Sequence, residues 1–440
     1  MKKTAAKFLL PILIVLGALA LMGLRNDGNA AAKDKNFYKD IKTFNEVLDM
    51  VRKNYVDEVD TTPLMQGAIN GMIRSLDPHS AFMTPDLYKE LEVETQGQFG
   101  GIGIEIMILK EVLTVVSPIE DTPAFNAGIK PGDQILKIDG KSTKDITTVE
   151  AVQKLRGPKD TKVTISILRE NMAAPKDITL TRAVIQIKSV KFKKLEDRIG
   201  YIRIAAFQER TVEDLRKALK DLNEKNNPLK GLVLDLRNDP GGLLTQAVEV
   251  SDVFLKEGTI VSTRGRVKSM ESKSTARDDN NEIGCPIVVL VNEGTASAAE
   301  IVAGALQDNG RALIMGTQTF GKASVQTVIP LEGGSALKLT TARYYTPKGR
   351  SIQAEGITPD ITVPFINPVE DTEIVVGKEE RLREKDLKGH IKPAKEDGTK
   401  MEEITGRNGK DLSDLQKDNQ LKTAVDILKS WDIMKKINVN

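Results

Sequence analysis

The spacing of hydrophobic residues changes along the chain, and each change indicates a different kind of structure. An uninterrupted apolar run extends from Phe8 to Leu24. From Asp34 to Tyr55 the apolar residues recur three or four positions apart, which predicts an amphipathic helix. Further helical segments are predicted at 64–76 and 85–91, so that residues 33–95 form a helical N-terminal cap.

A period of two begins near Gly97 and indicates β-structure. Isoleucines at positions 102, 104, 106 and 108 alternate with other residues, as in a half-buried strand. Short strands and turn-forming residues follow, then a predicted helix at 148–155 and a strand at 163–168. Residues 96–184 therefore form a second, separate block.

Longer apolar runs alternate with amphipathic helices over residues 185–365. Strands are predicted at 231–236 and 286–291, where the apolar runs are nearly continuous. The helices are predicted at 211–224, 243–254 and 297–306. Continuous apolar strands with helices between them indicate a sheet that is covered on both faces. This block is an α/β unit.

Residues 366–440 combine a charged tail with a C-terminal helix. The stretch 370–411 is rich in charge and poor in aromatic residues, which is typical of a solvated, partly disordered segment. The last segment places Leu421, Val425, Leu428 and Trp431 on one helical stripe. We expect this helix to dock on the protein itself or on a second subunit.

Composition excludes some classes of function. The 440 residues carry a net charge of only +2, so no strong field points to nucleic acid. A single cysteine, Cys285, excludes an internal disulfide, and the presence of only two histidines, His79 and His390, disfavours a transition-metal site. The same scarcity disfavours a histidine-based catalytic triad. We expect neither a metal nor a cofactor.

The N-terminus has the pattern of a targeting signal. Lysines precede the apolar run, and small residues at 30–32 offer a cleavage site. Residues 1–32 are therefore predicted to be a secretory signal peptide or an uncleaved membrane anchor. Either alternative predicts an exported protein in the periplasm or on the extracytoplasmic face of the inner membrane.

One serine lies at a strand-to-helix junction. Ser297, in the segment Gly294–Glu300, follows the apolar strand and opens a helix. Backbone N–H groups are unpaired there and the helix dipole is positive, which would stabilise an oxyanion beside the hydroxyl. The structural alternative is a capping box, because Ser297 and Glu300 have the Ser-x-x-Glu spacing.

The block 96–184 resembles a PDZ domain of the circularly ordered type found in bacterial proteases. The resemblance rests on the string Ala-Gly-Ile-Lys-Pro-Gly-Asp-Gln-Ile-Leu at 127–136. Backbone N–H groups of a glycine-rich segment can bind a terminal carboxylate, while the peptide adds as a strand. The predicted binding residues are Gly100, Gly101, Ile102, Gly103 and Ile104. The structural alternative is a tight turn. Arg156 either reports ligand binding or is a solvated helix end.

Three further segments resemble the carboxy-terminal processing (tail-specific) protease family. They are the stretch around Ser297, the segment holding Lys322 and Gln326, and Leu-Asp-Leu-Arg-Asn-Asp-Pro-Gly-Gly at 234–242. The resemblance covers roughly residues 40–365 and implies a crotonase/ClpP-like α/β protease core. It implies Ser297 as the nucleophile, Lys322 as the general base and Gln326 as the group that holds the lysine.

A serine–lysine pair needs a neutral amine. The reference pKa of lysine is about 10.4, and lowering it to near 7 requires about 4 kcal/mol of desolvation. Backbone donors for the oxyanion are predicted at Ala298 and at Gly241 or Gly242, although the two glycines also fit a plain turn. Ser324 is a rival nucleophile that lacks the helix-start context.

The predicted fold class is a multidomain α+β protein. It comprises the N-terminal segment 1–32, the helical cap 33–95, a PDZ domain at 96–184, the protease core at 185–365, and the charged tail with its C-terminal helix at 366–440. The predicted function is a serine endopeptidase whose partners are proteins or peptides with apolar C-termini. Alternatives are a catalytically silent PDZ scaffold and an acyl-CoA enzyme of crotonase type. The terminal amphipathic helices suggest self-association as a homodimer.

Overall fold

The computed structural model describes residues 37–109, 111–169, 172–224, 227–279, 283–366, 383–387, 389–391 and 418–437. The chain divides into two compact units, Met1–Met72 and Ile73–Asn440, and each is described by itself. The predicted signal peptide or membrane anchor at residues 1–32 and most of the charged tail lie outside the described residues. Among the helices that the structure describes, none has the length and apolar character needed to cross a membrane.

The N-terminal unit is helical, as its periodicity predicts. Residues 37–54 form one helix, and α2 (Thr61–Arg74) follows and runs into the second unit. Large apolar side chains on the first helix are exposed to solvent within this unit: Phe37, Tyr38, Ile41, Phe44, Val47 and Met50. The first helix thus presents an apolar stripe that its own unit does not bury.

The segment after α2 contains a strand that the sequence pattern did not predict. β1 (Ala81–Met83) pairs antiparallel with β18 (Ala336–Tyr345). Three residues are too short to show a period, so this strand depends entirely on its partner. The next helix, α3 (Pro85–Gln96), is longer than expected and ends where Gly97 adopts φ 67°.

The β-rich block has the predicted small sheet. Its strands are β3 (Ile104–Leu109), β4 (Val112–Pro118), β5 (Gln134–Ile138), β7 (Lys162–Leu168) and β8 (Lys176–Thr181), with β6 (Lys141–Ser142) beside β5. Helices α4 (Pro123–Asn126) and α5 (Thr148–Leu155) accompany it, and β2 (Gln98–Gly101) pairs separately with β9 (Ala183–Gln186). The predicted first strand begins only at Ile104, because Gly103 adopts φ 77°. Ile102 is buried instead in the core of this block.

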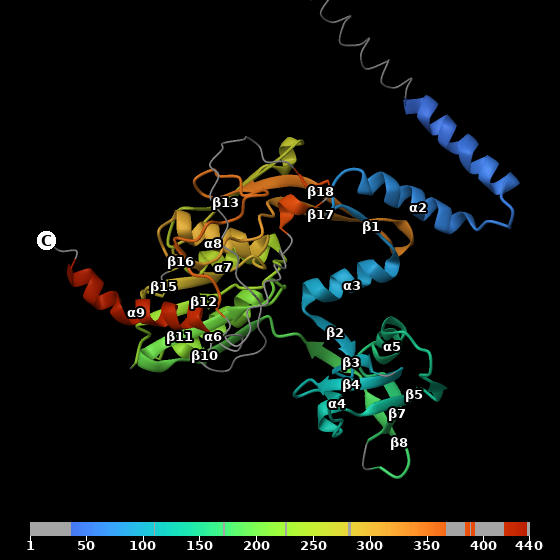
Figure 1. The fold of residues 1–440 in the computed structure, drawn as a ribbon, viewed down its shortest axis with the longest axis horizontal. Coiled ribbons are helices and arrows are strands. Elements are labelled where there is room, and N and C mark those ends of the chain that lie inside the picture. The colour runs from blue at the N-terminus through green and yellow to red at the C-terminus, as the bar shows by residue number, and fades with distance from the viewer. Residues whose placement is uncertain are drawn as a thin grey trace, which may run out of the picture. The chain divides into compact units, whose positions relative to one another are not determined.

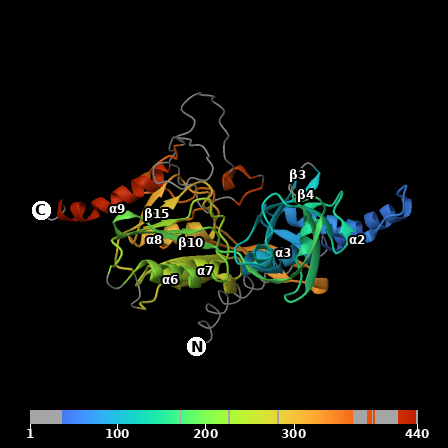
Figure 2. The ribbon, with the colours of Figure 1, turned by 90° about the horizontal axis from the view of Figure 1, so that it is seen from below.

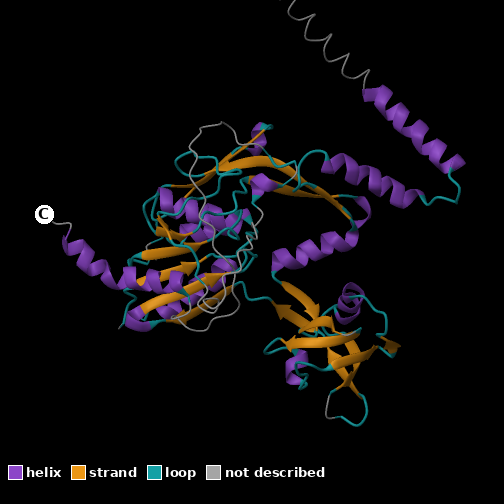
Figure 3. Cartoon of the chain, in the orientation of Figure 1, coloured by secondary structure: helices purple, strands orange, loops and turns teal. Residues whose placement is uncertain are grey.

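A six-stranded sheet forms the centre of the α/β unit (Figures 1 and 3). Its order is β10 (Val190–Lys194), β11 (Ile199–Ile204), β12 (Gly231–Asp235), β15 (Ile287–Val291), β16 (Leu313–Gly316) and β19 (Ile361–Thr362). All neighbouring pairs are parallel except β10 and β11. Every residue of β12 and β15 is buried, as their continuous apolar runs predict.

Helices cover both faces of this sheet, as the apolar strands predict (Figure 2). Alternate side chains of β12 divide between the faces, because Leu232 and Leu234 pack with one cluster and Val233 with the other. The first face is covered by α6 (Thr211–Leu222), α7 (Leu244–Asp252) and α8 (Ala298–Asp308). The second is covered by α9 (Asn419–Ile437).

The docking of α9 on its own chain resolves one of the two alternatives expected for the C-terminal helix. Leu421, Val425 and Leu428 are buried against the sheet. The helix start is also held by charge, since Asp418 pairs with Arg237 at 2.7 Å and Gln420 accepts a hydrogen bond from the same guanidinium. The last helix is therefore part of the α/β unit.

A second, antiparallel sheet lies in the same unit. It contains β1, β18, β13 (Thr259–Gly265) and β14 (Ser272–Thr275), and β17 (Ser324–Pro330) pairs with β18. The ten-residue β18 is the common partner of three of these strands. The loop between β16 and β17 leads from the central sheet into this second sheet.

We expect Leu428→Ala to loosen α9. The buried side chain leaves a cavity against the sheet, so the free energy of unfolding should fall by about 2–4 kcal/mol. Trp431, the only tryptophan, lies on α9, and its fluorescence during denaturant titration reports the transition. Lys422→Ala, an exposed site on the same helix, is the control and should change stability by less than about 0.5 kcal/mol. Equal effects of the two substitutions would contradict the docking.

Candidate active site

Ser297 lies in a strained turn between β15 and α8. Its φ of 53° and ψ of −113° place a non-glycine residue in the left-handed half of conformational space. The turn is tied to the neighbouring one after β12, because the Ala296 N–H donates to the Asp239 carbonyl at 2.9 Å and Thr295 Oγ1 donates to the Leu236 carbonyl at 2.8 Å. The serine is thus held in place at the carboxyl end of β15, a central strand of the sheet.

Glu300, one turn into α8, joins the serine to the lysine segment. Its carboxylate accepts the Ser297 N–H at 2.8 Å, as the predicted capping box requires. It also accepts the backbone N–H groups of Gly321 at 2.8 Å and Lys322 at 3.0 Å, and the Thr319 hydroxyl. Burial raises the pKa of Glu300 to about 7, although these donors favour the ionised form.

Tyr344, on β18, joins the same two residues through their carbonyl groups. Its buried hydroxyl lies within hydrogen-bond distance of the Ser297 carbonyl, at 3.0 Å, and of the Lys322 carbonyl. Burial raises the pKa of Tyr344 well above its ordinary value, so the phenol keeps its proton. The backbones of Ser297 and Lys322 are therefore linked twice, by Glu300 and by Tyr344.

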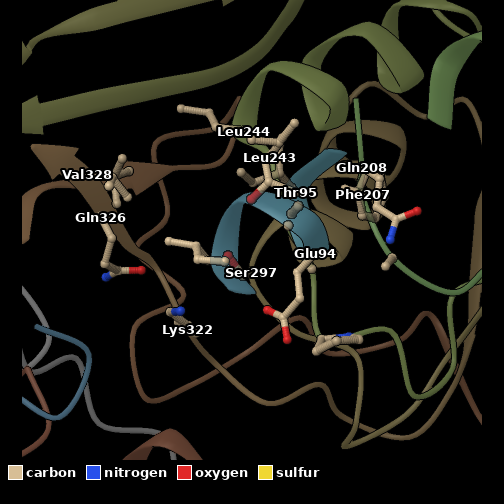
Figure 4. A pocket seen from close by; sticks show the side chains of 18 of the residues that line it. Glu94, Thr95, Phe207, Gln208, Leu243, Leu244, Ser297, Lys322, Gln326 and Val328 are labelled. Carbon is tan, nitrogen blue, oxygen red and sulfur yellow. The ribbon is translucent and has the colours of Figure 1, made fainter. Parts of the chain in front are cut away.

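Lys322 lies in an environment that disfavours its charge. Burial lowers the pKa of its amine, and the positive charge of Lys338 lowers it further, while Glu384, Glu300 and Asp77 oppose the shift. In the part of the chain that the structure describes, its amine forms no ion pair. Ser297 and Lys322 line one cavity of about 520 Å³ (Figure 4).

Gln326 lies in the same cavity, but its amide contacts other groups. It donates to Ser324 Oγ at 2.9 Å and to Thr340 Oγ1 at 3.2 Å, rather than to Lys322. Thr340 in turn donates to Asp77 Oδ1 at 3.1 Å. Ser324, the rival nucleophile, is almost completely buried within this network.

The predicted oxyanion donors differ in availability. The Gly241 N–H donates to Asp239 Oδ1 at 2.8 Å, so it is engaged in this conformation. The N–H groups of Gly242 and Ala298 have no acceptor among the described residues. Gly241 still needs to be glycine, because a Cβ there would lie 2.8 Å from the Cβ of Ser297.

Glu384 and Gln353, which the sequence analysis did not assign to the site, hold the loop that carries Lys322. Glu384 is fully buried, contacts His79 Nε2 at 2.7 Å and accepts the Gln353 amide at 2.9 Å. Gln353 Oε1 accepts the N–H of Ala323, next to the lysine, at 2.9 Å. The expectation of a solvated tail is therefore wrong at Glu384. No periodic signal marks it, because its burial depends on partners from distant segments.

A second, smaller groove lies in the β-rich block. It is lined by Phe99, Gly101, Ile102, Gly103, Ile104, Ile106, Val152, Leu155 and Arg156. Four of the five predicted binding residues contribute, whereas Gly100 pairs with Val184 on β9 and does not line the groove. The Arg156 guanidinium lies 4.6 Å from the centre of the Phe99 ring, so this residue is more than a solvated helix end.

Three family models match this arrangement of domains. Residues 198–363 match peptidase family S41, residues 100–180 match the PDZ domain, and residues 21–86 match the N-terminal domain of the activating protease CtpB. The fold is thus that of a serine peptidase of family S41.

The relatives narrow this class. A carboxy-terminal-processing protease of Bartonella bacilliformis is 48% identical over 365 residues, which cover 82% of this chain and 83% of the relative. The carboxy-terminal processing protease CtpA of Bacillus subtilis is 36% identical over 79% of this chain and 73% of its own. The solved photosystem II D1 C-terminal processing protease is 31% identical, with a TM-score of 0.44, over 72% of this chain and 85% of that one. The chain belongs to the carboxy-terminal processing proteases of family S41, which favours a peptidase over the scaffold and acyl-CoA alternatives.

We expect Glu300→Gln to destabilise the site. The amide brings N–H donors against backbone N–H donors, so buried groups lose their partner and the free energy of unfolding should fall by about 2–3 kcal/mol. Denaturant unfolding measures the loss. Glu257→Gln, at an exposed position in the same unit, is the control. A variant as stable as the wild type would show that the carboxylate does not hold the two segments together.

Proposed function

We propose that this enzyme is an endopeptidase that hydrolyses peptide bonds with Ser297 as nucleophile and Lys322 as general base. The observation that carries the proposal is the double link between these two residues through Glu300 and Tyr344. A structural serine cap would need only the Glu300 contact to its own helix. The additional links to the lysine segment support a shared catalytic role.

The chemistry follows from the state of the amine. Neutral Lys322 takes the proton of the Ser297 hydroxyl as the oxygen attacks the scissile carbonyl. The resulting ammonium then protonates the departing amine, leaving an ester on Ser297. A water molecule, deprotonated by the same amine, attacks this ester and releases the new C-terminus. The lowered pKa of Lys322 makes its neutral form accessible at lower pH than that of an ordinary lysine.

Two unpaired backbone donors support the tetrahedral intermediate. The N–H of Ala298 is at the positive end of α8, and the N–H of Gly242 belongs to the turn that follows β12. Gly241 contributes by allowing this turn to approach the serine closely. We assign the donor role to Ala298 and Gly242 in the conformation described.

The cavity around Ser297 supports a preference for an apolar residue before the scissile bond. Aliphatic side chains line its walls. They come from the residue before α7, from α7, from α8 and from β17: Leu243, Leu244, Ile301, Val325 and Val328. Burying an aliphatic side chain there removes apolar area from water. The charged residues of the lining, Glu94, Lys322 and Lys338, leave this aliphatic group as the apolar part of the cavity.

The PDZ groove is proposed to capture the substrate's C-terminal tail. Its walls are apolar at Ile104, Ile106, Val152 and Leu155, which suits an apolar terminal side chain. Gly101 and Gly103 let backbone N–H groups approach a carboxylate closely. Capture at the groove would raise the effective concentration of the chain near Ser297.

Export and the formation of a homodimer are also proposals. The lysine-flanked apolar run at 1–32 supports export to the periplasm, with or without retention as an anchor. The exposed apolar stripe on helix 37–54 supports a homodimer in which a second copy covers it.

We expect Ser297→Ala and Lys322→Met each to lower kcat/KM by roughly 10⁴-fold or more while the fold persists, because each removes an essential partner in proton transfer. Hydrolysis of a fluorogenic peptide with an aliphatic residue before the cleaved bond measures this. In the wild type, kcat/KM should rise with pH until Lys322 loses its proton, since only the neutral amine accepts one. Lys348→Met, an exposed lysine, is the control. Substantial cleavage by purified Ser297→Ala would rule out this mechanism.

Amidation of a peptide's C-terminus should weaken its binding by about tenfold or more, because the terminal carboxylate loses its charge-assisted hydrogen bonds. Fluorescence anisotropy of matched free and amidated peptides with an apolar last residue, measured on Ser297→Ala, tests the groove without cleavage. Equal affinity for the two peptides would contradict capture of the C-terminus.

A further inference from the structure

Asp239 is a buried acid that the proposed mechanism does not use. It lies in the turn after β12 and is fully buried. Its Oδ1 accepts the Gly241 N–H at 2.8 Å, and its backbone carbonyl accepts the Ala296 N–H at 2.9 Å. Its Oδ2 has no hydrogen-bond partner among the residues that the structure describes. A buried polar atom of this kind is uncommon and calls for an explanation.

The surroundings of Asp239 disfavour its ionised form. The charged groups that act on it come from the two adjacent strands: Arg203 on β11 favours the anion, and Asp235 on β12 opposes it. Arg203 is already committed, because it lies 3.6 Å from Asp235 and donates to the Arg237 carbonyl at 3.2 Å. Burial, the largest cause, raises the pKa of Asp239 to about 8. At neutral pH this side chain is therefore mainly an uncharged acid.

The position of Asp239 couples this proton to the reaction. It binds Gly241, and a Cβ on Gly241 would lie 2.8 Å from Ser297 Cβ and 2.9 Å from the Ala298 nitrogen. The following N–H, that of Gly242, is a proposed oxyanion donor. Because Asp239 is fully buried, a negative charge on it would be poorly screened and would oppose the charge that develops beside Gly242.

We propose that Asp239 is a positioning residue that supports hydrolysis only as the uncharged acid, and that its ionisation shuts the enzyme down at alkaline pH. The uncharged carboxyl keeps the glycine turn against Ser297 through its bond to Gly241. The anion binds the same N–H more strongly and opposes the charge that the turn must stabilise. This inference rests on the proposed function, because it requires an oxyanion beside Ala298 and Gly242.

The test compares the wild type with Asp239→Asn over pH 6 to 10. The amide keeps an oxygen that accepts the Gly241 N–H but does not titrate. For one group with a pKa of about 8, the wild-type kcat/KM should fall about tenfold between pH 7 and 9. The variant should lack this alkaline fall while keeping the rise that reports Lys322. Asp221→Asn, which changes an exposed carboxylate on α6, should behave as the wild type.

Thermal stability gives a readout that does not depend on catalysis. Because folding raises the pKa of Asp239, its protonation stabilises the native state below the unfolded pKa of 3.8, and this contribution is lost as pH rises to about 8. The Tm of Asp239→Asn relative to the wild type should therefore increase from pH 5 to pH 8 and level off above it. Glu300 titrates in both proteins and cancels in the difference.

Two outcomes would overturn the inference. One is an alkaline fall of kcat/KM that is the same in the wild type and in Asp239→Asn. The other is a folded Asp239→Asn protein that is inactive at every pH, since a neutral isostere should suffice. Failure of the proposed function looks different, because Ser297→Ala would then still cleave the peptide whatever the pH profile of Asp239→Asn.

Discussion

The active arrangement depends on holding two backbone segments together from both sides. Glu300 accepts N–H groups from Ser297 and Lys322, and Tyr344 reaches the carbonyl groups of the same two residues. Both bridging side chains are buried, so water does not compete for these bonds. A flexible lysine gains a defined position because its backbone, rather than its amine, is fixed. The amine then remains without an ion pair among the described residues and can lose its proton.

The α/β fold explains why these segments meet. The strands β12 and β15 are parallel neighbours, and the turns that follow them carry Asp239–Gly242 and Ser297. Ligand sites in such sheets gather at the carboxyl ends of the strands. Lys322 lies instead on the loop between β16 and β17, which joins the central sheet to the antiparallel one. Tyr344 on β18 secures that junction, so the two sheets share the site.

Much of this arrangement could be predicted from the sequence. The apolar periods predict the helices and the buried strands, and the capping-box spacing predicts the Glu300 bond to Ser297. The bonds from Glu300 to the lysine segment could not be predicted, because they join residues that are 21 and 22 positions apart in different elements. β1 and Glu384 were missed for the same reason. Gln326 was expected to bind the lysine, but it donates to Ser324 and Thr340, since side-chain direction is not a property of spacing.

The docking of the last helix has a consequence for the timing of activity during synthesis. The face of β12 that carries Val233 is covered by α9, and Arg237, just after that strand, binds Asp418, 181 residues later. A nascent chain therefore lacks this cover until its final segment has left the ribosome. The turn that bears Gly242, a proposed oxyanion donor, directly follows the uncovered strand. Unfinished chains should thus be poor hydrolases until α9 has docked.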